Sequence, residues 1–166
     1  MLTRNVIVDN TPPTTTFNGF VEGTGAQYQA TDLGNPALHW FNNAQGGSVT
    51  VRIGATDGGG TGVNNVAFPA FPGPWTNPSL VDNTAPSPYE STYTWTACAT
   101  PACEPGAVVA TATDNAGKSA TRGFTVQADT GVPFGGSISP PHGAQTGTTA
   151  VIPFTVGNDS QSGIDL

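Results

Sequence analysis

Lysine and arginine are scarce in this sequence. Its 166 residues contain 4 of them against 11 aspartates and glutamates, which gives a formal net charge of -7 at pH 7. A chain of this charge would be repelled by a phosphate backbone, so nucleic acid is not an expected partner. An acidic, lysine-poor composition is common in secreted proteins, where it aids solubility. We therefore expect an extracellular or cell-surface location.

Long apolar runs and helical periodicity are also missing. No stretch approaches the ~20 apolar residues of a membrane helix, so membrane insertion is not expected. Nothing near Met1 resembles a secretory leader, and an exported parent protein would carry its leader outside this sequence. The 22 glycines and 15 prolines, with abundant threonine and valine, favour short strands joined by turns. The sequence predicts an all-β fold.

Cysteine occurs only twice, as Cys98 and Cys103. A zinc site needs more ligands, and neither histidine is close to the two thiols in sequence. We predict a short-loop disulfide formed in an oxidising compartment, which would stabilise the fold by about 2 kcal/mol. Two unpaired thiols in a cytosolic protein are the alternative.

Catalytic motifs are missing as well. The segment FGGSIS around Ser137 lacks the later glycine of a nucleophile elbow. The two histidines have no serine or cysteine partner that the sequence makes evident. We therefore expect no enzymatic activity and no cofactor, apart from the calcium ion considered below.

The sequence does contain an internal repeat. The segment Thr3–Pro13 matches Thr121–Pro133, and Val49–Val63 aligns without gaps to Ala150–Ile164. A repeat of roughly a hundred residues is typical of domains joined in a row rather than of a solenoid. The neighbours of this unit in the parent chain are therefore expected to be further repeats.

The repeat sets the predicted domain boundaries. Residues 1–8 are predicted to be the last strand of a preceding repeat, residues 9–128 one complete module, and residues 129–166 the N-terminal part of a following module, which is truncated. The segments DNTPP and ADTGVP would act as stiff, proline-containing junctions between modules.

Alternation of apolar and polar residues assigns the strand faces. Val49, Val51 and Ile53 fall on one face of a half-buried strand, and Tyr93 and Trp95 share a face of another. Several short strands with tyrosine and tryptophan in the core predict a sandwich of two sheets.

The order YTW, a turn, PGAVVATATDNAGKSATRGFTV and then a DNTPP-type junction resembles the Ig-like repeats of large secreted bacterial surface proteins. The resemblance implies an Ig-like β-sandwich of the Greek-key type. It also implies a non-enzymatic spacer or stalk module of a secreted or cell-surface bacterial protein. The sequence departs from the common pattern in the cysteines after Trp95 and in an expansion of 19 residues before Ser48.

Three aspartates are predicted to meet at one pole of such a sandwich. Asp57 and Asp114 end the second and sixth strands in the similar segments ATDGGG and ATDNAG, and Asp9 lies in the incoming junction. Calcium prefers oxygen ligands of this kind. The alternative is that each aspartate only accepts hydrogen bonds from its own turn, with the following glycine supplying a positive φ.

Aromatic residues give the alternative function. Those expected outside the core are Tyr28 and Trp40 in the expansion, with His39 and Phe41, and Phe71, Trp75 and Tyr89 in a proline-rich loop. An exposed platform of this kind would suit an adhesin or a carbohydrate-binding module that binds glycan or a surface protein. The segment FPAFPGPW could instead cover a sheet edge, with Trp75 filling a gap beneath it.

Overall fold

The computed structural model describes residues 8–98, 101–140, 147, 149 and 151–162. Its elements are β1 (Thr14–Glu22), the 3-10 turn η1 (Ala26–Tyr28), β2 (Gln29–Thr31), β3 (Leu38–Phe41), β4 (Gly47–Thr56), β5 (Val63–Ala67), β6 (Val81–Asp82), β7 (Tyr89–Trp95), β8 (Gly106–Asp114), β9 (Ser119–Ala128), β10 (Ser137–Ile138) and β11 (Phe154–Thr155). The predicted all-β class is confirmed. The described part of the chain contains no helix with the length and apolarity needed to span a membrane.

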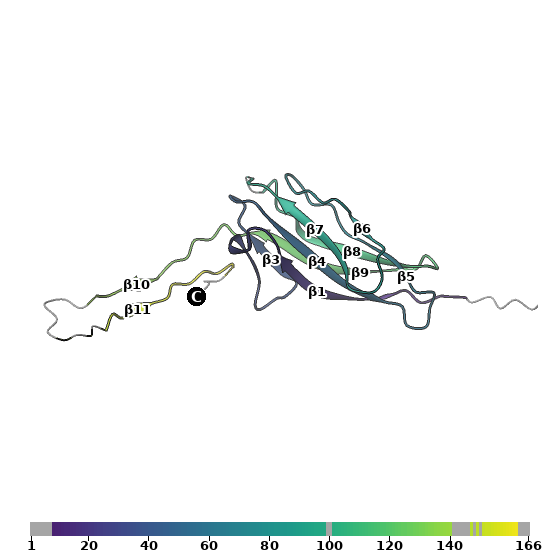
Figure 1. Ribbon diagram of the computed structural model, residues 1–166, viewed down its shortest axis with the longest axis horizontal. Coiled ribbons are helices and arrows are strands. Elements are labelled where there is room, and N and C mark those ends of the chain that lie inside the picture. Colours follow the sequence, from purple (N-terminus) through teal and green to yellow (C-terminus); the bar gives the residue numbers. More distant parts are fainter. Residues whose placement is uncertain (1–7, 99–100, 141–146, 148, 150, 163–166) are drawn as a thin grey trace, which may run out of the picture.

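The strands β1 to β9 form two sheets that pack against each other as in a β-sandwich (Figure 1). One sheet has the order β1-β4-β7 and the other the order β2-β3-β9-β8-β5-β6. The chain passes between the sheets after β1, β3, β4, β6 and β7. Residues of the predicted strand at 1–8 lie outside the described residues, apart from Val8.

The core lies between the sheets and follows the predicted alternation. Val49, Val51 and Ile53 of β4 are buried, as are Tyr93 and Trp95 of β7. Each outward position between them carries a polar side chain, which is what a sheet with one wet face requires. The predicted faces of both strands are therefore confirmed.

The indole of Trp95 is packed so closely in the core that the residue opposite it must be a glycine. Gly47 pairs with Trp95 across β4 and β7. A Cβ atom placed on Gly47 would lie 2.5 Å from two ring carbons of Trp95. No residue with a side chain fits at this position unless the indole moves, which a close-packed interior resists.

The expansion before Ser48 adds strands rather than a surface loop. It contains η1, β2 and β3, and β3 pairs in parallel with β9 from Leu38↔Thr125 to Phe41↔Ala128. Two of its residues, His39 and Phe41, are fully buried, so the prediction that they lie outside the core is wrong. The expansion therefore extends the larger sheet beyond β9.

The predicted disulfide is present. Cys98 and Cys103 are bonded, with 6.2 Å between their Cα atoms, in the connection from β7 to β8. Cys103 is fully buried, and its carbonyl accepts a hydrogen bond of 2.8 Å from the indole N–H of Trp75. Cys103 is buried because the proline-rich loop that carries Gly73 and Trp75 packs against it.

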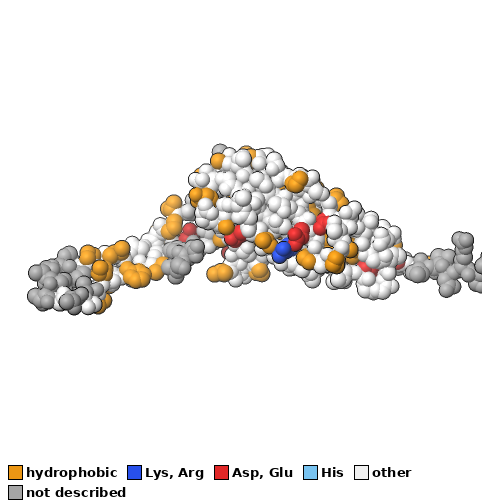
Figure 2. All heavy atoms as spheres, viewed as in Figure 1, with side chains coloured by type: hydrophobic (Ala, Val, Ile, Leu, Met, Phe, Trp, Pro, Cys, Tyr) orange, Lys and Arg blue, Asp and Glu red, His pale blue; other side chains and the backbone are white. Residues whose placement is uncertain are grey.

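The chain leaves the sandwich after Ala128, at the pole opposite the one where β1 begins (Figure 1). It continues into a projecting hairpin, β10 paired with β11. Apolar side chains gather on this hairpin (Figure 2). Those more than half exposed are Val132, Phe134, Ile138, Val151, Ile152 and Phe154.

Candidate functional site

Strand parity places two aspartates at the same pole. Asp114 is the last residue of β8, on the same face as Ala110 and Ala112, and it is 1% exposed. Asp57 directly follows β4 and continues the face of Ile53 and Ala55. Because β4 and β8 end at the same pole, alternation alone brings both carboxylates to the edge of the core.

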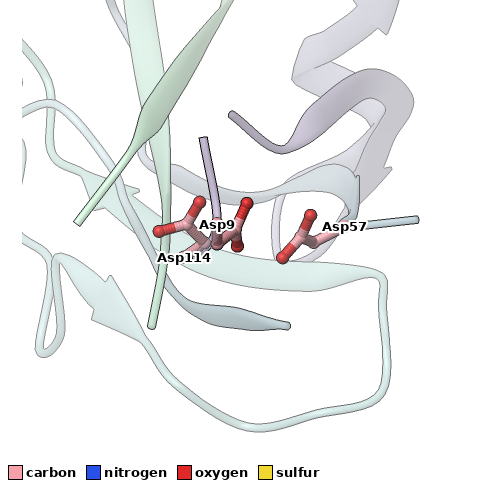
Figure 3. Close-up of side chains that lie close together, drawn as sticks. All are labelled: Asp9, Asp57 and Asp114. Atoms are coloured by element: carbon pink, nitrogen blue, oxygen red, sulfur yellow. The ribbon is translucent and has the colours of Figure 1, made fainter. Parts of the chain in front are cut away.

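The third aspartate arrives with the segment that precedes β1. Asp9, Asp57 and Asp114 each offer a carboxylate oxygen, and these three oxygens lie within 4.8 Å of one another. Figure 3 shows Asp9 between the other two side chains. The structure therefore brings together the three residues that the sequence predicted to converge.

The Asp9 carboxylate accepts four hydrogen bonds, two of them from the turn that follows β4. Its Oδ2 accepts from the backbone N–H and the hydroxyl of Thr61, at 2.8 and 2.9 Å. Its Oδ1 accepts from the N–H and hydroxyl of Thr11, at 3.1 and 3.0 Å. These donors, the Thr61 N–H first, lower the pKa of Asp9 to about 2. The group is therefore ionised at neutral pH.

Asp114 shapes its own turn with only one of its two oxygens. Oδ1 accepts from the N–H groups of Ala116 and Lys118, each at 2.8 Å. Gly117 supplies the positive φ, +82°, that the turn requires. The turn interpretation of DNAG is therefore correct for Oδ1. Oδ2 is buried and has no hydrogen-bond partner in the described part of the chain.

The two turns are tied to each other beside the carboxylates. Asp57 Oδ2 accepts from the N–H of Gly62 at 2.7 Å. The Asn115 amide donates to the carbonyls of Thr61 and Gly62, at 2.9 and 3.1 Å. Asn115 therefore acts as a brace between the turns that carry Asp57 and Asp114.

No basic side chain balances these acids within the described residues. The ion pair found there joins Arg52 to Glu90 at 2.7 Å, on the outer face of β4 and β7. Lys118 donates its backbone N–H to Asp114. Three carboxylates without a cation repel one another, and a bound cation would relieve that repulsion.

The aromatic platform predicted from the sequence is not present as a unit. Trp75 and Tyr89 are 6% and 3% exposed and belong to the core, so the prediction that they lie outside it is wrong. Trp75 packs edge-on against Phe41, and Tyr89 begins the inward face of β7. Trp75 is covered because the proline-rich loop that carries it folds onto the core.

Tyr28 and Trp40 do reach the surface. Tyr28 is 37% exposed, and the indole N–H of the half-buried Trp40 donates to Asp32 at 3.3 Å. Both side chains line a hollow of about 260 Å³ with Asp129 and Asp159, where the projecting segment meets the sandwich.

Sequence reasoning missed a buried polar pair in the expansion. His39 Nε2 lies 3.0 Å from the side-chain oxygen of Gln29, and both residues are buried. Burial lowers the pKa of His39 to about 4. The alternation of His39 with Phe41 in LHWF is the signal that could have placed the imidazole inside.

Comparison with protein-family models, with curated proteins and with solved structures gave no match for this chain.

Proposed function

We propose that this chain is a non-enzymatic spacer, built from Ig-like modules that follow one another along a secreted or cell-surface bacterial protein. The observation that carries the proposal is the position of the two connections. The preceding segment reaches the sandwich beside Asp57 and Asp114, whereas the chain leaves after Ala128 at the other pole (Figure 1). When modules are connected end to end in this way, each further module lengthens the protein by about its own length.

The strand order supports the Ig-like interpretation. In an Ig-like sandwich the strands A, B and E lie in one sheet, and C, F and G in the other. Here β1, β4 and β7 correspond to strands A, B and E, and β5, β8 and β9 correspond to strands C, F and G. The inserted β3 lies in parallel beside β9 and extends that sheet.

The hydrogen bonds at the two junctions support the tandem arrangement. Asp9 accepts from the N–H of Thr11 and the hydroxyl of Thr61. Asp129 accepts from the N–H of Gly131 at 3.0 Å and from the hydroxyl of Ser162. The repeat aligns Gly131 with Thr11 and Ser162 with Thr61, so the two aspartates accept hydrogen bonds from equivalent residues.

The projecting hairpin pairs antiparallel, as β1 and β4 do, with a register one residue away from that of the repeat, which aligns Phe17 with Ser137. Phe17 lies opposite Ile53 in β1 and β4, and Ile138 lies opposite Phe154 in β10 and β11. The repeat aligns Phe154 with Ile53. We propose that further strands of a following module cover the apolar side chains that this hairpin exposes.

The location of the protein is part of the same proposal. A structural disulfide is typical of oxidising compartments, and the chain has one between Cys98 and Cys103. The acidic charge of -7 suits a surface exposed to the medium.

A head-to-tail dimer of the unit tests the spacer function. In one polypeptide, residues 9–128 would be followed directly by a second copy of residues 9–128. Asp9 of the second copy then follows Ala128 of the first, as Asp129 does in the natural sequence. A ten-residue strand such as β4 spans roughly 33 Å, so we expect small-angle X-ray scattering to give a maximum dimension of roughly 80 Å. A dimer no longer than one unit of roughly 40 Å would contradict the spacer function.

Glycan binding is the second candidate function, favoured by the hollow that Tyr28 and Trp40 line. Aromatic rings at a hollow with nearby carboxylates are a common basis for sugar binding. If this function holds, the chain will bind a glycan array, and Trp40→Ala will lose the signal. Val109→Ala, on the outer face of β8, is the matched control that should retain it. If no glycan on the array binds, this second function is wrong and only the spacer function remains.

A further inference from the structure

We propose that Asp9, Asp57 and Asp114 bind one calcium ion at the pole where the preceding segment meets the sandwich. The binding of the ion does not depend on the spacer function and would stand if that function were wrong. Three observations carry the inference: an unpartnered buried oxygen, the spacing of the carboxylates, and the absence, among the described residues, of an ion pair between a basic side chain and any of the three aspartates.

The unpartnered oxygen is the most direct of the three. Asp114 is 1% exposed, and its Oδ2 has no hydrogen-bond partner in the described part of the chain. A buried carboxylate oxygen without a partner is costly, and proteins rarely keep one without a ligand or a bound water. The DNAG turn is fully formed by Oδ1, so turn formation does not account for Oδ2.

The spacing of the carboxylates fits calcium. Two oxygens bound to one Ca²⁺ can be up to about 5 Å apart, because each lies about 2.3–2.6 Å from the ion. The three oxygens of the cluster lie within 4.8 Å of one another. Mg²⁺ allows at most about 4.2 Å and demands octahedral geometry, so it fits this set less well.

The surroundings can complete the coordination. Calcium takes six to eight oxygens, of which three carboxylates supply a part. Asp9 and Asp57 are only half-buried, so water can reach the ion from their side. The Asp57 carboxylate accepts one hydrogen bond within the described residues, at Oδ2, so Oδ1 has capacity for an ion.

An ion at this place would join three separate parts of the chain. Asp9 belongs to the segment before β1, Asp57 to the turn after β4, and Asp114 to the turn after β8. Calcium would hold the incoming segment against both turns and fix its direction. In a tandem protein it would therefore control the angle between consecutive modules.

Calorimetric titration of the chain with calcium chloride tests the site. We expect one ion per chain, because Asn158 stands where the repeat aligns with Asp57 and the second junction therefore has fewer acids. The expected dissociation constant is about 0.1–1 mM, the range of extracellular calcium modules. The melting temperature should rise with calcium, relative to EDTA, and rise less with magnesium.

Two variants distinguish a metal ligand from a structural aspartate. Asp114→Asn retains an Oδ1 that can accept from Ala116 and Lys118 and removes one negative charge. We therefore expect it to melt in EDTA at or above the temperature of the unmodified chain, and to lose the rise with calcium. Asp57→Asn should weaken calcium binding at least tenfold. Glu22→Gln, at the far end of β1, removes the same charge and should leave binding unchanged.

Several results would overturn the proposal. One is the absence of binding heat, together with an unchanged melting temperature, at calcium concentrations up to about 10 mM, well above the range of such modules. Another is unchanged binding in both Asp57→Asn and Asp114→Asn. An equal loss in Glu22→Gln would show that calcium only screens the acidic surface.

Discussion

Replacing Trp95 by alanine is expected to remove a large part of the stability of the sandwich. The side chain is 1% exposed, with its ring 5.6 Å from Phe41 and 4.8 Å from Trp75. Truncating a buried tryptophan costs about 3–5 kcal/mol, because the contacts are lost and the cavity collapses only in part. Gly47 faces the indole without a side chain and cannot fill the space. Domains of this size are stable by about 5–15 kcal/mol in total.

Urea denaturation followed by tryptophan fluorescence and circular dichroism measures this loss. The midpoint should fall while the slope stays close to that of the unmodified chain. Val109→Ala is the control, because Val109 is 54% exposed on the outer face of β8 and its truncation should change stability by about 0.5 kcal/mol or less. A cost below about 1 kcal/mol for Trp95→Ala would mean that the core is looser than the contacts imply.

Mild acid is expected to destabilise the protein through His39. The imidazole is fully buried and its pKa is lowered to about 4 from an ordinary value of 6.5. In the unfolded chain His39 takes up a proton near pH 6.5, whereas in the folded protein it does so only near pH 4. Stability is therefore complete above pH 6.5, falls between pH 6.5 and 4, and changes little more from this group below pH 4. The total loss is about 3 kcal/mol.

Chemical denaturation at a series of pH values checks this expectation, with His39→Gln as the comparison. Glutamine does not titrate and can still donate to the side-chain oxygen of Gln29. The variant should show a flatter profile between pH 6.5 and 4. The pKa of Asp9 is about 2, so loss of its hydrogen bonds appears only at lower pH. Equal slopes in the two proteins would show that His39 is not the group responsible.

The sequence was most informative where a regular strand fixed the direction of each side chain. Alternation along Val49–Ala55 and Tyr93–Trp95 predicted which residues are buried, and the same parity extends to Asp57 and Asp114. The meeting of Asp9 with these two residues was predicted from the direction of the strands in the Ig-like topology that the resemblance implies. The candidate site was therefore predictable, because it lies where regular strands end.

The parts that were mispredicted lie where periodicity gives no information. Trp75 is in a proline-rich loop, and no local pattern shows that this loop covers the core. The burial of Tyr89, by contrast, could have been predicted, because the alternation of Tyr93 and Trp95 continues back to it through Ser91. The pairing of β3 with β9 joins residues far apart in the chain, and no turn or repeat in the sequence predicts this pairing.

The parallel pairing of β3 with β9 has a consequence for a chain under tension. A pull on the segment before β1 and on the segment after Ala128 acts along the long axis of the sandwich, because the two segments leave at opposite poles (Figure 1). The hydrogen bonds between Leu38–Phe41 and β9 lie across that direction and are loaded in shear. They must fail together rather than one at a time, so the expansion before Ser48 would raise the force at which the last strand is torn out.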